Sequence, residues 1–162
     1  MIDNAAILAS VIQQYTGIPA SRIVIPDGTF EAPKDKKVYV TIRPGVPKSI
    51  GISRKFDNAN QRERISNTIM QEMIVEVCSR NEEAEQYYFE VSQATTSSLA
   101  EEAANLYGIK FFRPASITNL TAIEGVGSLR RYQIRFNISK VETKETAQAV
   151  YTQFPIGGIN NE

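Results

Sequence analysis

The chain has 162 residues with 18 Lys or Arg, 18 Asp or Glu, no His and one Cys. A chain of this length forms one domain that buries roughly two-thirds of the surface its unfolded form exposes. Zero net charge argues against a strongly basic nucleic-acid binder. The absence of histidine excludes Ser-His-Asp triads, Cys-His pairs and His-based metal sites, and we expect no cofactor.

The single cysteine excludes an intramolecular disulfide framework and indicates a reducing compartment. Cys78 lies in an apolar segment, MIVEVCSR, where a small buried thiol is expected rather than a nucleophile. No apolar run reaches the ~20 residues that span a bilayer. We therefore expect a soluble protein that is cytoplasmic when it is synthesised and has no membrane partner.

The charges are unevenly distributed along the chain. Residues 1–64 hold 10 basic against 6 acidic side chains, residues 65–112 hold 2 against 8, and residues 113–162 hold 6 against 4. The three parts therefore carry +4, −6 and +2. This pattern is compatible with ordinary solvated faces, or with a basic surface that meets the acidic surface of another copy.

The first third of the chain changes from helical to strand periodicity. Residues 3–17 have apolar side chains at helical spacing, a cap at Asp3 or Asn4 and a stop at Gly17, which predicts an amphipathic helix. After it we expect strands and loops. These are a short strand over 21–28, a polar loop over 31–37, strands over 37–45 and 48–56, and a turn over 57–61. The strand over 48–56 is predicted to place Ile50, Ile52 and Phe56 on one face.

One long strand is predicted over residues 63–80, because its centre is rich in β-branched residues. Residues 81–108 begin with acidic side chains and end at Gly108, as a helix does. This is either one helix or two helices with a break near 95–98. In the second case Ser98 and Glu101 form a capping box.

The last part of the domain is predicted to be a long hairpin. Residues 109–123 form a strand interrupted at Pro114, and they pair with residues 128–141 across a glycine-containing turn. The fold class is therefore α+β, a mostly antiparallel twisted sheet with two helices on one face. We expect a single domain over 1–151 and an extended C-terminal arm over 152–162.

Within residues 128–143, SLRRYQIRFNISKVET, polar and apolar side chains alternate strictly over 131–139. This period is typical of a strand with one buried face. The apolar set is Tyr132, Ile134, Phe136 and Ile138, and the polar set includes Arg131 and Arg135. The partners of these two arginines therefore bear on the function.

Glu72 and Glu76 have the same four-residue spacing as Arg131 and Arg135. If the two strands are neighbours, either in one sheet or in adjacent copies, the two sets oppose each other. Exposed ion pairs contribute only about 0–1 kcal/mol, so their expected value is to fix the register between surfaces. We predict that these four residues lie at a subunit interface.

A carboxylate enzyme is the remaining catalytic alternative. Glu72 and Glu76 on one strand face are about 13 Å apart at ~3.3 Å per residue. That separation exceeds the ~5–9.5 Å between the carboxylates of glycosidases. We therefore expect no enzymatic activity.

Three consecutive segments form a recognisable order. A long strand leads into an acidic helix (IMQEMIVEVCSRNEEAEQYYFEVSQA), a helix end leads into a strand (EEAANLYGIKFFRPASITNLTAI), and an arginine-led alternating strand follows (RRYQIRFNISKVET). Over about residues 65–143 this order resembles the tail terminator, or neck terminator, proteins of tailed bacteriophages. The resemblance implies a small α+β virion protein without catalytic residues. Such a protein forms a hexameric ring at the head-proximal end of the tail, ends growth of the tail tube and joins the tail to the neck.

The resemblance also implies a set of partners. These are further copies of the chain, the tail tube protein and a neck or head-completion protein, with a sheath protein as a further candidate. Synthesis takes place in the cytoplasm of the bacterial host. The alternative is a non-enzymatic binding or regulatory domain that uses the same sheet as a dimer interface.

Two further sets of residues are predicted to contact partners. Basic side chains on the polar segments 31–37 and 56–64 contact the tube or neck, or line a channel where DNA passes without base readout; they are Lys34, Lys36, Lys37, Arg62 and Arg64. The C-terminal residues Tyr151, Phe154, Ile156 and Ile159 either fold back over their own sheet or dock on an adjacent subunit or neck protein.

Overall fold

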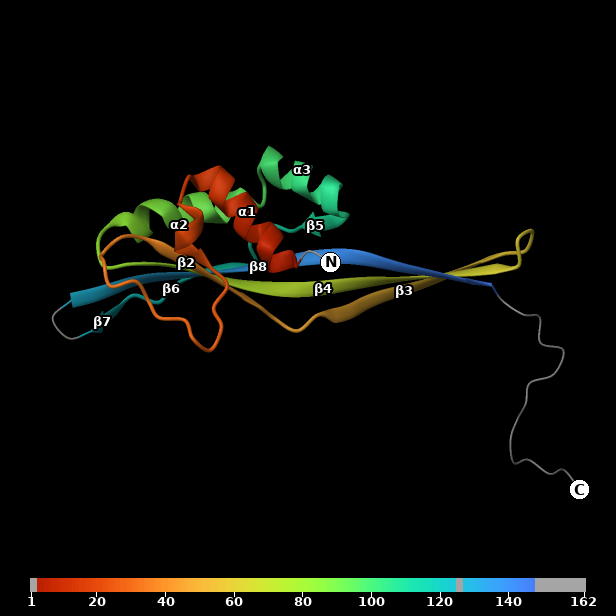
Figure 1. Ribbon diagram of the computed structural model, residues 1–162, viewed down its shortest axis with the longest axis horizontal. Coiled ribbons are helices and arrows are strands. Elements are labelled where there is room, and N and C mark those ends of the chain that lie inside the picture. Colours follow the sequence, from red (N-terminus) through yellow and green to blue (C-terminus); the bar gives the residue numbers. More distant parts are fainter. Residues whose placement is uncertain (1–2, 125–126, 148–162) are drawn as a thin grey trace, which may run out of the picture.

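Two long antiparallel strands form the axis of the protein in the computed structural model, which describes residues 3–124 and 127–147 (Figure 1). β4 (Arg62–Ser79) and β8 (Gly127–Ala147) pair without a register shift from Arg62 opposite Ala147 to Ser79 opposite Arg130. Both strands were predicted from the sequence. β8 extends four residues beyond the predicted end at residue 143.

Shorter strands complete the sheet on either side of this pair. β2 (Tyr39–Pro44) and β3 (Lys48–Asp57) are both antiparallel to β4, and β1 (Ile23–Val24) is parallel to β2. On the other side, β5 (Ile109–Phe111), β6 (Ser116–Asn119) and β7 (Ala122–Glu124) pair with β8. The sheet is mixed and mostly antiparallel, which confirms the α+β class.

Three helices, rather than the predicted two, lie on one side of the sheet (Figure 1). They are α1 (Asn4–Thr16), α2 (Glu83–Ala94) and α3 (Ser98–Tyr107); a short 3-10 turn, η1 (Ala20–Arg22), precedes β1. The break between α2 and α3 confirms the two-helix alternative for residues 81–108. The predicted cap was wrong by one residue, because it is the Ser97 side chain that accepts a hydrogen bond from the Ala100 N–H at 3.2 Å.

The ends of α1 follow the sequence signals. The Asp3 carboxylate accepts a hydrogen bond from the Ala5 N–H at 3.3 Å. At the other end Gly17 has a φ of 74°, and its N–H donates to the Gln13 carbonyl at 2.9 Å. That left-handed conformation is one that glycine adopts without steric cost, so the helix stops where the sequence predicts.

The predicted hairpin is present, with an interruption at its centre. Phe111 pairs with Ile138 and Ser116 with Arg135, so five positions along one strand match three along β8. Pro114 lies among the extra residues between Phe111 and Ser116, and proline has no N–H to donate to the pairing of two strands. The Ala115 N–H rejoins β8 by donating to the Arg135 carbonyl at 2.8 Å.

The hydrophobic core lies between the helices and the face of the sheet beneath them. Met73, Val75 and Val77 of β4 point toward the helices, together with Ile134, Phe136 and Ile138 of β8. Leu8 and Ile12 of α1 and Val91 of α2 are fully buried against them. The alternation of residues 128–143 therefore predicted the buried face of β8 correctly.

The sheet continues well beyond the helices. There β3, residues 62–69 of β4 and residues 141–147 of β8 form a three-stranded ribbon, which we call the β-extension. Figure 1 shows it projecting from one end of the helix-covered body. All ten residues of β3 are exposed.

Candidate assembly interface

The four residues predicted at a subunit interface form two ion pairs inside one chain. Arg131 donates to the Glu76 carboxylate at 2.6 and 3.1 Å, and Arg135 donates to Glu72 at 2.9 Å. Glu76 is opposite Gln133 and Glu72 is opposite Asn137, so each arginine lies two positions diagonally from its partner. The first alternative, pairing within the sheet, is therefore present, and a contact between copies through these residues stays a prediction.

The two pairs differ in burial. The Glu76 side chain is 7% exposed and that of Arg131 is 37% exposed, whereas Glu72 and Arg135 are 40% and 42% exposed. Burial alone raises the pKa of Glu76, but the hydrogen bonds and charge of Arg131, with help from Gln133 and Arg43, outweigh it and lower the pKa below 4.5. Glu76 and Arg131 are thus a structural pair, and Glu72 and Arg135 remain accessible to a partner.

The lone cysteine is next to this pair. Cys78 is buried and lies opposite Tyr39 of β2 in the sheet. Burial, reinforced by the charge of Glu76, raises the pKa of the Cys78 thiol to about 11, and burial raises the pKa of Tyr39 to about 12. Because the thiolate is the nucleophilic form, Cys78 is a poor nucleophile at neutral pH.

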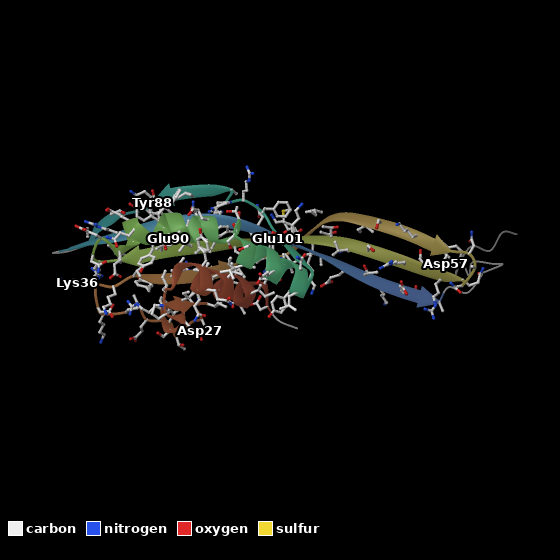
Figure 2. The ribbon with its side chains drawn as sticks, turned by 90° about the horizontal axis from the view of Figure 1, so that it is seen from above. Asp27, Lys36, Asp57, Tyr88, Glu90 and Glu101 are labelled. Carbon is white, nitrogen blue, oxygen red and sulfur yellow. The ribbon has the colours of Figure 1, made fainter. Side chains whose placement is uncertain are left out.

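The predicted basic segments lie at opposite ends of the molecule. Figure 2 shows Lys36 at the end that carries α2 and Asp57 at the tip of the β-extension. Lys34, Lys36 and Lys37 are exposed in the loop before β2. Arg62 and Arg64, which were placed on the polar segment 56–64, lie at the start of β4; Arg64 is also within the strand predicted over 63–80, and it lies 3.6 Å from Glu145 of β8. The lysines before β2 and the arginines at the start of β4 therefore lie too far apart on one copy to contact the same partner surface.

The C-terminal residues Tyr151, Phe154, Ile156 and Ile159 lie outside the described residues. The described part of β8 ends at Ala147, opposite Arg62 at the tip of the β-extension. The chain therefore leaves the described structure at the end farthest from the helices.

One face of the β-extension carries a set of large apolar side chains. Strand alternation continues from Met73 and Val75, which point toward the helices, to Ile65 and Ile69 on the same face of β4. Ile52 is opposite Asn67 and Phe56 is opposite Glu63, so both also belong to this face. We call the set Ile52, Phe56, Ile65 and Ile69 the core-side face, because it continues the core face of the sheet.

Among the described residues, the two β3 members of the core-side face are uncovered, whereas Ile65 and Ile69 of β4 are half-buried. Viewed from the side of the helices, the strands of the β-extension lie bare (Figure 2). Ile52 is 70% exposed and Phe56 is 45% exposed. On the opposite face Val141 is also exposed, but its neighbours Ser53, Ser66 and Thr143 are polar. The core-side face is mixed, because the same register places Arg54, Glu63, Glu142 and Lys144 on it, and Arg54 lies 3.0 Å from Glu63.

The edges of the β-extension are also open among the described residues. β3 pairs with β4 on one side only, and the pairing of β5 with β8 stops at Lys140. Open strand edges present unpaired N–H and C=O groups that favour contact with another chain. Sequence reasoning predicted β3 as a strand with an apolar face but missed that this face is uncovered, since alternation does not show what packs against a strand.

The described residues show no other arrangement that indicates chemistry. They contain no group of three or more His, Cys, Asp or Glu side chains placed to hold a metal ion. Over the same residues, no helix has the length and apolar character needed to cross a membrane. No protein-family model matches the chain, and no curated protein matches it. Fold and surface thus describe an α+β protein whose most unusual feature is a long, uncovered β-extension.

Proposed function

We propose that the protein is a structural subunit of a bacteriophage virion. Copies of it form a ring of six at the head-proximal end of the tail, where the ring ends growth of the tail tube and joins the tail to the neck. The observation that carries this proposal is the uncovered β-extension. The order of elements over residues 65–143, which resembles tail terminator proteins, supplies the identity of the assembly.

The β-extension favours assembly for a physical reason. Ile52 and Phe56 keep large apolar surfaces in water, and burying such surface stabilises an assembly by about 25 cal/mol per Å². Large exposed apolar patches mark interaction sites. A projecting element that docks on a different surface of the next copy makes a head-to-tail contact, and such contacts form a ring when the rotation between copies closes and an open filament when it does not.

Residue types also fit a structural role. The buried ionisable side chains Glu76 and Cys78 are occupied by packing and pairing within the sheet. The exposed pair Glu72 and Arg135 lies on the face of the sheet opposite the helices. Exposed basic residues lie at both ends of the molecule, where different partners can reach them. These features supply recognition surfaces on several sides of one subunit, as a joining protein needs.

The proposal is tested by polymerising the tail tube protein of the same phage with and without this protein. We expect tubes to become shorter as the ratio of this protein to tube protein rises, with density added at one tube end in electron micrographs. Heat-unfolded protein at the same concentration is the control. Unchanged tube lengths together with no binding at tube ends would contradict the proposal.

A further inference from the structure

The edge strand β3 is separated from β2 by a short break in the sheet. β2 and β3 pair one after the other with the same edge of β4. Pro44 lies opposite Met73 and Lys48 lies opposite Met70, so between these pairs three residues of the break face two residues of β4. Pro44 and Pro47 have no N–H to donate. The break therefore has few backbone groups with which to pair.

A set of hydrogen bonds spans this break. The Gly45 N–H donates to the Glu72 carbonyl at 2.7 Å, and the Gln71 side-chain amide donates to the Gly45 carbonyl at 2.9 Å. The oxygen of the same amide accepts a hydrogen bond from the Asn4 side chain at 3.2 Å. Asn4 is the first residue of α1, so these bonds connect the helix layer to the sheet edge where β3 begins (Figure 1). We call Asn4, Gly45 and Gln71 the β3 junction.

The surroundings of the β3 junction fix its geometry. A Cβ atom on Gly45 would lie 3.0 Å from the Glu72 carbonyl oxygen, so glycine allows the break to approach β4 this closely. Gln71 is two residues before Met73 and therefore lies on the side of β4 that faces the helices. Because the Asn4 amide donates to the oxygen of Gln71, the nitrogen of Gln71 faces Gly45.

Little else attaches the first residues of β3 to the protein. All ten residues of β3 are exposed, so burial of apolar surface contributes little there. The register shifts between Ser49 and Gly51, which interrupts the pairing with β4 close to the junction. At the other end, the turn after Asp57 connects β3 directly to β4, and the Asp57 carboxylate accepts two hydrogen bonds from backbone N–H groups of this turn. Local opening of β3 therefore begins at the junction.

We propose that the β3 junction controls whether β3 stays paired with β4, and that Gln71 is its positioning residue. While the junction is formed, Ile52 and Phe56 lie on one face of the β-extension. When it opens, the first residues of β3 separate from β4 and Ile52 leaves that face. The consequence for assembly rests on the proposed function, whereas the attachment of β3 does not.

The test uses two full-length variants that disrupt the junction from either side. Gln71→Met keeps the approximate size of the side chain and removes both of its hydrogen bonds, and Gly45→Ala places a methyl group against the Glu72 carbonyl. The matched control is Gln61→Met at the other end of β3, where the Gln61 amide donates to the Asn58 carbonyl at 2.9 Å. Hydrogen–deuterium exchange is measured by mass spectrometry, at a dilution at which all four proteins have the same mass.

We expect exchange over residues 48–52 to become about tenfold faster in Gln71→Met, the order of magnitude for losing two hydrogen bonds. Gly45→Ala should change exchange over the same residues in the same direction. Residues 73–78 of β4, which pair with β2, should exchange as in the wild type, and Gln61→Met should leave residues 48–52 unchanged. Exchange over 48–52 that stays at the wild-type rate in either junction variant overturns the proposal. An increase that is no larger there than over 73–78, or one that Gln61→Met reproduces, also overturns it.

Ring formation by the same variants separates this inference from the proposed function. Faster exchange over 48–52 together with loss of rings on tail tubes supports both. Faster exchange with normal rings supports the junction and shows that the ring does not need β3 in place. If the wild-type protein forms no ring and Gln71→Met still exchanges faster over 48–52, the ring is contradicted and the junction is supported.

Discussion

Replacing Arg131 with Ala is expected to lower the free energy of unfolding by about 2–3 kcal/mol. Removing one partner of a buried ion pair costs about 3–5 kcal/mol, because the other charge is left without compensation. The lower range applies here because Arg131 is 37% exposed while Glu76 is almost fully buried. Urea unfolding of the wild type and the variant, with equal slopes, measures the difference.

Arg135→Ala is the matched control for this prediction. Its pair with Glu72 has the same diagonal geometry on the same two strands, but both side chains are about 40% exposed. Exposed pairs contribute about 0–1 kcal/mol, so the expected loss is about 0.5 kcal/mol. Equal losses of unfolding free energy in Arg131→Ala and Arg135→Ala would show that the burial of Glu76 does not increase the contribution of its ion pair to stability.

The pH dependence provides an internal check on the same pair. The pKa of Glu76 is lowered in the folded protein, so its contribution is fully present above the unfolded value near 4.5. It is lost as the pH falls through the folded pKa. Without Arg131, burial raises the pKa of Glu76 above 4.5, so the difference in unfolding free energy between the wild type and Arg131→Ala should be largest at pH 7 and shrink as the pH falls, with the remainder lost below pH 4.5. A difference that does not change with pH would contradict the assignment.

Removing the β-extension is expected to abolish assembly and to leave a folded monomer. Gly51 and Thr68 are opposite each other, so residues 52–67 can be replaced by Asn-Gly, which favours the two-residue turn of a hairpin. The same variant ends at Lys140, where pairing with β5 begins. Because every residue of β3 is exposed, the core under the helices loses little buried area. The midpoint of thermal unfolding should stay within a few degrees of the wild-type value.

A second truncation separates the β-extension from the C-terminal arm. A chain that ends at Ala147 keeps all three strands of the extension and lacks residues 148–162. We expect it to assemble like the wild type, while the variant without the extension does not. Loss of assembly in both chains would instead support the predicted docking of the C-terminal arm through Tyr151 and Phe154.

Much of the fold is predictable from local patterns. The alternation of residues 128–143 identifies β8 and its buried face, because a strand with one covered face must repeat with period two. Gly17 and Gly108 mark the ends of α1 and α3. Both have the positive φ values that end a helix, and glycine adopts such values without steric cost. In each case one short segment contains all the information that its structure needs.

The exposure and register of β3 depend on segments far away in the sequence and could not be predicted from its own pattern. Periodicity identified Ile52 and Phe56 as one face of a strand, but their exposure depends on where the helices end over the sheet. Ile50 was expected on that same face. A register shift between Ser49 and Gly51 instead places Ile50 beside Lys48 and Met70, in a shallow pocket that also contains Glu72.

The glutamate and arginine pairs show the same limit. Their four-residue spacing predicted that they oppose each other, and the uninterrupted register of β4 and β8 brings them together in one chain. The difference in burial between Glu76 and Glu72 depends on the side chains that surround them. Spacing along the sequence contains no information about that difference.

The mass of the purified wild-type protein tests the central claim, self-assembly into a ring, most directly. Native mass spectrometry, alone and with short tail tubes, should give a species of about 109 kDa, six times the chain mass of 18.1 kDa. If the ring forms only on a tube, the free protein should be a monomer, and six copies should be found at the tube end. A stable dimer of about 36 kDa that does not bind tubes would contradict the ring and support a dimeric binding domain.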